Sequence, residues 1–250
     1  MVKFKDSLGK ALILWIVGLF PLLFSVIVEA LNFPEYVINV MYGVSTFIGG
    51  LLCLFVANKE YDIKIKYHNW KLNFRDLIFI IGFSFFYNMS VMSIIRKELL
   101  LEVYGEKDIV PLSLLIGSSI FGPIGEELIY RYGIFTALKG KSSNIFRIIV
   151  SILISSIIFM IIHFDFGFIR MIDLFVFGVI ACLIFIATKN LLYCIIFHSI
   201  ANAVVFGSLI FFSKVRYNEK IMFICIPLAV IFGISFFYFA KKKDSTKLTP

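Results

Sequence analysis

The segment Ile109–Leu138, IVPLSLLIGSSIFGPIGEELIYRYGIFTAL, decides the fold, because it is almost wholly apolar and still carries three charges. A membrane helix needs about 20 mostly apolar residues, so this segment is long enough to span a bilayer with residues to spare. The sequence Gly-Pro-Ile-Gly at 122–125 interrupts it, and a proline inside a helix removes a hydrogen bond and kinks the chain. The charges follow this break directly, at Glu126, Glu127 and Arg131.

The three charges predict that the second half of this segment faces a protein interior or an open cavity. Together they cost on the order of 8–10 kcal/mol at the centre of a membrane, whereas each apolar residue returns only about 0.3–0.6 kcal/mol. An ionisable residue at membrane depth is by default a hypothesis for a functional site.

The rest of the chain predicts an all-α, polytopic membrane protein with a single transmembrane domain over 1–250. The chain is 60% hydrophobic and 16% charged, with a mean hydropathy of +0.97. Soluble domains are about 45–50% apolar and about 25% charged, so an ordinary soluble enzyme is excluded. We expect about eight transmembrane helices, the long and kinked one being the fourth. They cover 11–31, 36–57, 76–95, 109–138, 146–163, 170–187, 190–212 and 221–240.

The basic residues indicate a lipid bilayer as partner and no nucleic acid, although the net charge is +8. They cluster in short loops, where lysine and arginine set the orientation of a membrane protein and contact anionic headgroups. The positive-inside rule then places both termini in the cytoplasm, and the even number of spans agrees. Abundant Ile, Lys, Phe, Asn and Tyr favour an AT-rich genome and hence a bacterial cell membrane. The loop with Lys214, Arg216 and Lys220 is the exception to the charge pattern.

Glu127 and Arg131 are spaced i, i+4 with the acid first, which is the favourable order for a helical ion pair. Glu126 lies about 100° around the helix and has no local partner. Two carboxylates in such different environments can take different acid and base roles, so Glu126 is the predicted general base and Glu127 its anchored neighbour. Taken alone, the Glu127–Arg131 pair is equally consistent with a buried strut.

Two histidines also fall inside predicted membrane helices. His163 ends the sequence Phe-Met-Ile-Ile-His that begins at Phe159, whose predicted role is packing. His198 and Asn202 are spaced i, i+4 and share one helix face. Such a pair can hold a water, polarise a carbonyl or stabilise an oxyanion. It can equally form a hydrogen bond between helices, worth about 1 kcal/mol in membranes.

The three patterns E-E-x-x-x-R, F-x-x-x-H and H-x-x-x-N, in this order on three predicted helices, resemble the CAAX protease and bacteriocin-processing (CPBP, or Abi) family of intramembrane endopeptidases. The resemblance covers a catalytic core of about residues 109–210. It implies an α-helical membrane peptidase whose active site opens toward the cytoplasmic side, and whose substrate is a peptide or a membrane protein.

The resemblance also implies a role for each matching residue. Glu126 activates the attacking water with the help of His163. His198 and Asn202 stabilise the oxyanion. The ion pair of Glu127 and Arg131 organises the site.

Metal dependence stays open at the level of sequence. The family is often classed as metallopeptidase, and Glu126, His163 and His198 could ligate zinc with an open fourth position. The chain has no H-E-x-x-H, so a metal-free glutamate mechanism is equally consistent with it.

The expected function is hydrolysis of an amide bond in a peptide or membrane-anchored protein, in bacteriocin or signal-peptide maturation or in self-immunity. Two alternatives stay open: a non-catalytic membrane scaffold or immunity factor, and an ion- or proton-coupled transporter. Intramembrane Glu and His residues also mark ion pathways, but the sequence lacks the internal repeat of many transporters.

The predicted depths of the site residues do not match. At 1.5 Å per residue from the loop near Gly140, Glu126 lies roughly 20 Å deep and His163 about 27–35 Å deep. His198 lies only about 15 Å from the start of its helix. Convergence requires tilts, kinks or spans that begin at different heights.

Overall fold

The computed structural model describes residues 4–61, 71–94, 112–163, 167–214 and 220–245, and within these ranges it contains helices and no strand. The predicted all-α class is confirmed. The helices are α1 (Phe4–Leu19), α2 (Leu22–Ala30), α3 (Glu35–Glu60), α4 (Phe74–Ile94), α6 (Leu112–Ile116), η1 (Gly117–Phe121), α7 (Gly122–Glu127), η2 (Leu128–Phe135), α8 (Thr136–Lys139), α9 (Ile145–Ile161), α10 (Gly167–Thr188), α11 (Leu191–Lys214) and α12 (Lys220–Ser245).

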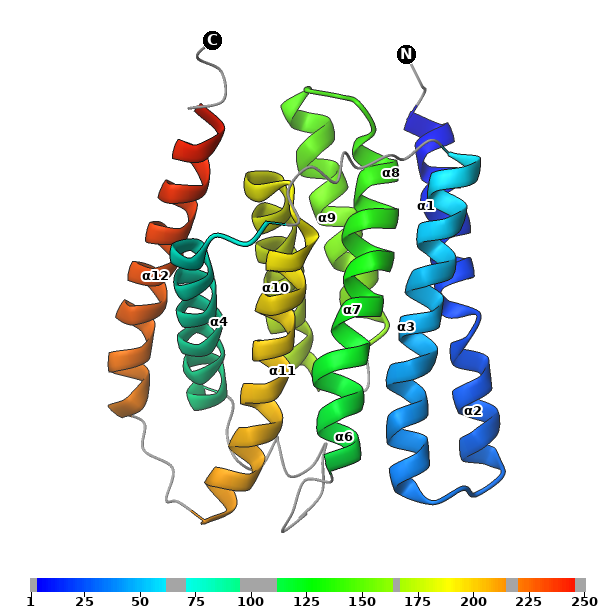
Figure 1. Ribbon diagram of the computed structural model, residues 1–250, viewed down its shortest axis with the longest axis horizontal. Coiled ribbons are helices and arrows are strands. Elements are labelled where there is room, and N and C mark those ends of the chain that lie inside the picture. Colours follow the sequence, from blue (N-terminus) through cyan, green and yellow to red (C-terminus); the bar gives the residue numbers. More distant parts are fainter. Residues whose placement is uncertain (1–3, 62–70, 95–111, 164–166, 215–219, 246–250) are drawn as a thin grey trace.

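The helices run up and down in one bundle (Figure 1). Six helical stretches of the described chain are long and apolar enough to cross a membrane, and α9 and the 191–207 part of α11 are shorter apolar helices. With α1 and α2 counted as one pass and α6 to α8 as another, the described residues form eight helical passes, in agreement with the prediction of about eight spans from the sequence. The start of α1 and the end of α12 lie at the same end of the bundle, here termed the chain-end side (Figure 1).

The first predicted span differs from the structure because Pro21 breaks it into α1 and α2. Proline has no N–H to donate to the preceding turn, so α1 ends at Leu19 and a new helix begins at Leu22. The carbonyl of Pro21 accepts a hydrogen bond of 3.0 Å from the N–H of Phe24, which starts the second helix.

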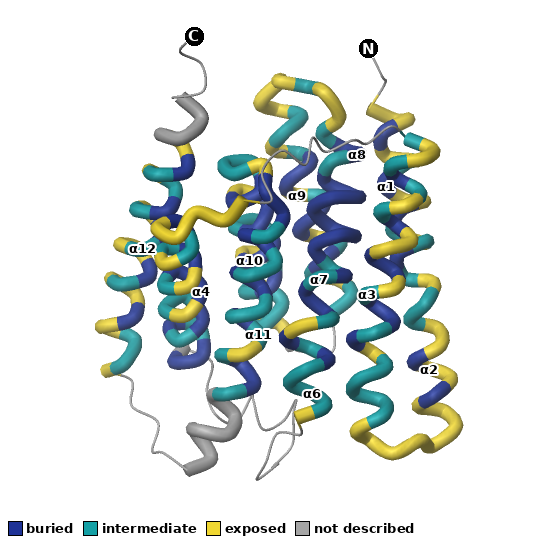
Figure 2. Tube along the Cα trace, in the orientation of Figure 1, coloured by how far each residue is buried: buried dark blue, intermediate teal, exposed yellow. Residues whose placement is uncertain are grey.

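The charged fourth segment is the buried centre of the bundle, as its cost in lipid predicted. Its backbone stays helical from Leu112 to Lys139, and π-helical turns precede and follow the short α-helix that holds Pro123. Every residue from Leu128 to Phe135 is buried, and Figure 2 shows the same central column as largely buried. π-helical turns occur frequently at functional sites, because they shift side chains relative to a regular helix.

Glycines bring α3 close to the central column. A Cβ added at Gly50 would lie 2.7 Å from the Cα and the carbonyl oxygen of Gly125, both of which are backbone atoms. Small residues allow this approach of helix backbones, which is a common basis of helix association in membranes. The glutamates that follow Gly125 are therefore held against a rigid neighbour.

We expect Gly50→Ala to destabilise the protein, by roughly 1–3 kcal/mol, because the added methyl group forces α3 away from α7. Thermal unfolding of the purified protein in detergent measures this loss. Gly9→Ala is the matched control, since a Cβ at Gly9 meets nothing within 4 Å. Equal melting temperatures for the two variants would contradict the close packing of α3 on α7.

Candidate active site

The predicted Glu127–Arg131 ion pair forms and is fully buried. Arg131 Nη1 lies 3.0 Å from Glu127 Oε1, and the two side chains are 1% and 0% exposed. The guanidinium also lies over the ring of Phe159, 4.8 Å from its centroid. A buried charge of this kind is stable only with its partner in place, so the pair fixes the position of Glu127.

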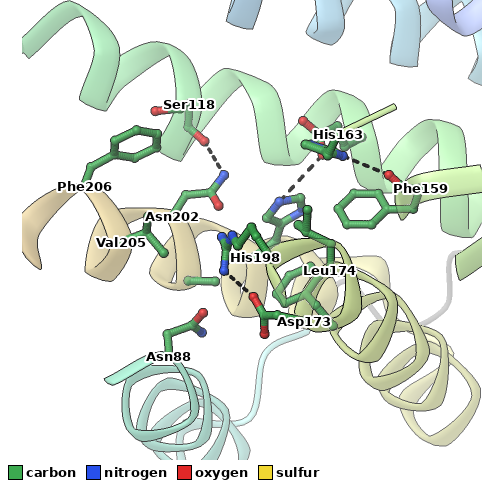
Figure 3. A pocket seen from close by; sticks show the side chains of 14 residues that line it. Asn88, Ser118, Phe159, His163, Asp173, Leu174, His198, Asn202, Val205 and Phe206 are labelled. Atoms are coloured by element: carbon green, nitrogen blue, oxygen red, sulfur yellow. Dashed lines mark hydrogen bonds and ion pairs between the residues drawn. The ribbon is translucent and has the colours of Figure 1, made fainter. Parts of the chain in front are cut away.

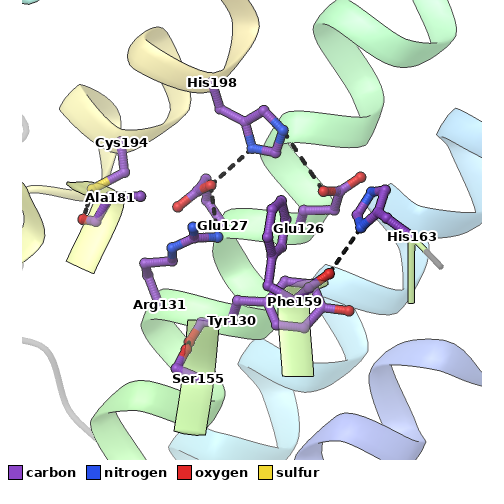
Figure 4. Close-up of polar contacts among 10 residues, drawn as sticks. All are labelled: Glu126, Glu127, Tyr130, Arg131, Ser155, Phe159, His163, Ala181, Cys194 and His198. Carbon is purple, nitrogen blue, oxygen red and sulfur yellow. Dashed lines mark hydrogen bonds and ion pairs between the residues drawn. The ribbon is translucent and has the colours of Figure 1, made fainter. Parts of the chain in front are cut away.

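His198 lies between the two glutamates (Figure 4). Its Nδ1 is 2.8 Å from Glu127 Oε1, and its Nε2 is 3.7 Å from Glu126 Oε2. An ionised carboxylate can only accept, so Nδ1 carries the proton of this hydrogen bond and Nε2 is directed toward Glu126. Glu127 therefore orients His198, a contact between two helices that the sequence did not predict.

His163 lies just beyond the end of α9, and its ring folds back along the helix. The N–H of its Nδ1 donates to the carbonyl of Phe159 at 2.8 Å. A carbonyl only accepts, so Nδ1 carries a proton, and in the neutral imidazole Nε2 is then the acceptor nitrogen. The ring of Phe159 packs between the two histidine rings, with centroid distances of 4.9 Å to His163 and 5.8 Å to His198. The predicted packing role of Phe159 is confirmed.

The amide nitrogen of Asn202 donates to the backbone carbonyl of Ser118 at 2.7 Å. This hydrogen bond joins α11 to η1. A hydrogen bond between helices was the alternative role considered for the His198–Asn202 pair. It uses one of the two amide hydrogens, so the other remains for a ligand.

A cavity of about 160 Å³ joins these residues (Figure 3). Glu126, His163, His198 and Asn202 all line it, from α7, the end of α9 and α11. Glu127 and Arg131 lie behind this wall rather than on it. Glu126 is the more accessible acid, with 17% of its side chain exposed against none for Glu127. The structure therefore brings all of the predicted site residues together.

The relative height of α9 and η2, and the direction of the His163 side chain, explain how residues at different predicted depths converge. The hydroxyl of Ser155 donates to the carbonyl of Tyr130 at 3.0 Å, so these residues of the antiparallel α9 and η2 are level. One turn further from the chain-end side, Phe159 is then level with Glu126. His163 lies another turn away, and its side chain points back along α9 toward Phe159.

Four polar residues that line the cavity were not predicted from the sequence. Asn88 comes from α4, Ser118 from η1, and Arg170 and Asp173 from the first turns of α10. Asp173 forms an ion pair with Arg170 and accepts a hydrogen bond of 2.9 Å from the hydroxyl of Tyr87. Arg170 and Asp173 could have been found from the sequence, because they are charged residues in a predicted membrane span, which is the argument that selected Glu126.

The arrangement does not present a ready metal site. Within the part of the chain that the structure describes, no three His, Cys, Asp or Glu side chains are grouped to hold a metal ion, and this includes Glu126, His163 and His198. Zinc is held by ligand atoms about 2.0–2.2 Å away. The hydrogen bonds of Nδ1 in His163 and in His198 do not argue against a metal, because histidines that ligate a metal through Nε2 commonly donate from Nδ1 to a carbonyl or carboxylate.

The part of the chain that holds this site is similar to known proteins. Residues 108–204 match the type II CAAX prenyl endopeptidase Rce1-like family, and this range contains all of the residues described above except Asn88 and Tyr87. Over 140 residues the chain is 29% identical to the membrane-embedded CAAX protease MroQ of Staphylococcus aureus (strain USA300). Both matches agree with the resemblance to the CAAX protease and bacteriocin-processing family that the sequence motifs indicated.

The match to this relative covers 50% of the present chain and 55% of the relative. The chain thus spans about half the length of the curated CAAX protease that it matches. No solved structure gives a significant match to the chain. The apolar helices of the described chain support an integral membrane protein.

Proposed function

We propose that this protein, which is similar to CAAX proteases, is an intramembrane endopeptidase that hydrolyses an amide bond in a peptide or a membrane-anchored protein. The observation that supports this most directly is the shared cavity, in which an acid, two imidazoles and a carboxamide from three helices face one another. The reaction serves the maturation of a bacteriocin or signal peptide, or self-immunity.

Glu126 is the general base of this proposal. It lines the cavity, and its Oε2 has no hydrogen-bond partner among the described residues, although it is buried. A carboxylate in this position accepts a proton from a water as the water oxygen attacks the carbonyl carbon of the substrate. The same proton then passes to the nitrogen of the leaving amine as the C–N bond breaks. His163 helps to hold the water through its imidazole.

His198 and Asn202 stabilise the oxyanion that forms on the substrate carbonyl oxygen. Glu127 accepts from Nδ1 of His198, and in the imidazolium form Nε2 also carries a proton that it can donate. Asn202 offers its second amide hydrogen while the first holds the carbonyl of Ser118. Donors that are fixed before the reaction stabilise developing charge without reorganisation. Arg131 and Glu127 support this arrangement from behind the cavity.

We expect Asn202→Ala to lower kcat by roughly 10²–10³-fold while KM changes little, because the lost donor acts mainly on the oxyanion. Steady-state cleavage of a membrane peptide measures both constants. Asn144→Ala is the matched control: its side chain caps α9 by accepting from the N–H groups of Phe146 and Arg147, away from the cavity. It should lower the melting temperature and leave kcat near the parent value. A rise in KM alone for Asn202→Ala would remove Asn202 from the oxyanion site.

The function itself is tested by incubating the purified protein in lipid vesicles with a panel of membrane-associated peptides, with and without a chelator. A peptidase produces two fragments that mass spectrometry assigns to one amide bond. Full activity in the chelator supports the glutamate mechanism, and complete inhibition that zinc reverses supports a metal mechanism. Absence of cleavage across the panel, in a protein that still confers immunity on cells, supports the scaffold alternative instead.

A further inference from the structure

The cavity lies to one side of the middle of the bundle. Glu126 and His198 form its inner end, and the lining then extends away from the chain-end side. Ser118 lies in η1, close to the start of the fourth pass, and His163 lies beyond the last turn of α9. Arg170 lies in the first turn of α10. These three helix ends all point away from the start of α1 and the end of α12 (Figure 1).

Toward the chain-end side, the site is closed by a layer of buried side chains. Tyr130, Phe135, Ile184 and Cys194 are each 1% exposed or less. The rings of Phe135 and Phe185 pack edge to face across this layer, with centroids 6.2 Å apart. In contrast, Ser118, His163, Arg170 and Asn202 in the other half of the cavity are all partly exposed. A substrate that came from the chain-end side would have to open the packed core.

The positive charges identify which side of the membrane this is. Of the 16 Lys and Arg residues within the described ranges, 12 lie in the helix turns or connecting residues of the chain-end side. Within the same ranges three lie on the other side, at Arg170, Lys214 and Lys220. Excess lysine and arginine in short loops marks the cytoplasmic face. The chain-end side is therefore the cytoplasmic side by this rule, and the cavity lies in the opposite half.

We propose that the cavity opens in the extracytoplasmic half of the membrane, and that its substrate class is a peptide segment presented from outside the cell. The cytoplasmic opening implied by the family resemblance conflicts with the cytoplasmic chain ends, because the structure places cavity and chain ends in opposite halves. The charge distribution decides between these two expectations. The side of access follows from structure and charge alone, whereas the substrate class rests on the proposed function.

Access is tested with single added cysteines and a charged, membrane-impermeant maleimide. Ser118→Cys places a thiol on the cavity wall, and Val205→Cys repeats the measurement from α11. The four native cysteines are buried, and the parent protein gives their background. We expect both added cysteines to be labelled in intact cells, with no further gain after the membrane is permeabilised.

Cysteines at two exposed positions, one on each side of the bundle, show independently which side of the membrane faces the reagent. Leu31→Cys lies between α2 and α3, on the side opposite the chain ends, and should be labelled in intact cells. Ser143→Cys lies between α8 and α9, on the chain-end side, and should be labelled only after permeabilisation. The proposal fails if the cavity cysteines follow Ser143→Cys, or if they stay unlabelled in both conditions. It also fails if Ser143→Cys is labelled in intact cells and Leu31→Cys is not.

A second measurement separates access from catalysis. A peptide cleaved by the protein in vesicles is added to right-side-out and to inside-out membranes, and cleavage is expected only in the right-side-out membranes. Labelling of Ser118→Cys should be unchanged by Glu126→Gln, since access does not require the reaction. Correct labelling without any cleavage would refute the peptidase and leave the outward opening standing. Cleavage confined to inside-out membranes would refute the outward substrate.

Discussion

Glu126→Gln is expected to lower the rate of peptide cleavage by roughly 10²–10⁴-fold, the contribution typical of a general base. Glutamine keeps the size of the side chain and removes its ability to accept a proton from water. Glu126 lies on the cavity wall and makes no hydrogen bond through Oε2 within the described chain, so the fold depends little on its charge. Single-turnover cleavage of a membrane peptide in vesicles measures the loss directly.

The melting temperature of Glu126→Gln should stay close to that of the parent, and the variant should still insert into membranes. Glu127→Gln is the informative comparison, because Glu127 is fully buried and is bound by both Arg131 and His198. It should lose stability as well as activity. If Glu126→Gln cleaves at the parent rate, the base must be another residue and the mechanism proposed above is wrong.

The positions of the helices were largely predictable because lipid leaves few alternatives. A segment in the bilayer must satisfy its own backbone, so apolar runs of sufficient length become helices. The spans predicted at 170–187 and 190–212 correspond to α10 (Gly167–Thr188) and α11 (Leu191–Lys214). The main wrong prediction was an unbroken first span, because hydropathy does not reflect that Pro21 lacks a backbone N–H.

The site was predictable in its members and less so in its contacts. The cost of charge in lipid selected Glu126, Glu127 and Arg131, and the i, i+4 spacing predicted their ion pair. Periodicity within one helix carries no information about what a neighbouring helix places opposite. The contact of His198 with Glu127 and the contribution of Asn88 from α4 depend on helix heights that only packing determines.

The largest effect on stability is expected at Arg131. Its guanidinium is 1% exposed and makes no aligned hydrogen bond within the described residues, so it is held by the Glu127 carboxylate and the ring of Phe159. Arg131→Met fills the same space and leaves the Glu127 charge buried without its cation. Breaking a buried pair in this way costs about 3–5 kcal/mol. Unfolding in a denaturing detergent, followed by circular dichroism, measures the loss.

The double variant Glu127→Gln with Arg131→Met separates charge from shape. Because it removes both buried charges, it should recover most of the stability that Arg131→Met loses, as replacement of a whole buried pair by neutral groups is often nearly neutral.

Lys59→Met is the exposed control, since the Lys59–Glu60 pair is 66% and 58% exposed and is worth no more than about 1 kcal/mol. The recovered double variant should nevertheless remain inactive, because Nδ1 of His198 then faces an amide in place of a carboxylate and its imidazolium form loses its counter-charge. A double variant as unstable as Arg131→Met would mean that the arginine acts through packing on Phe159, and that the ion pair contributes little to the fold.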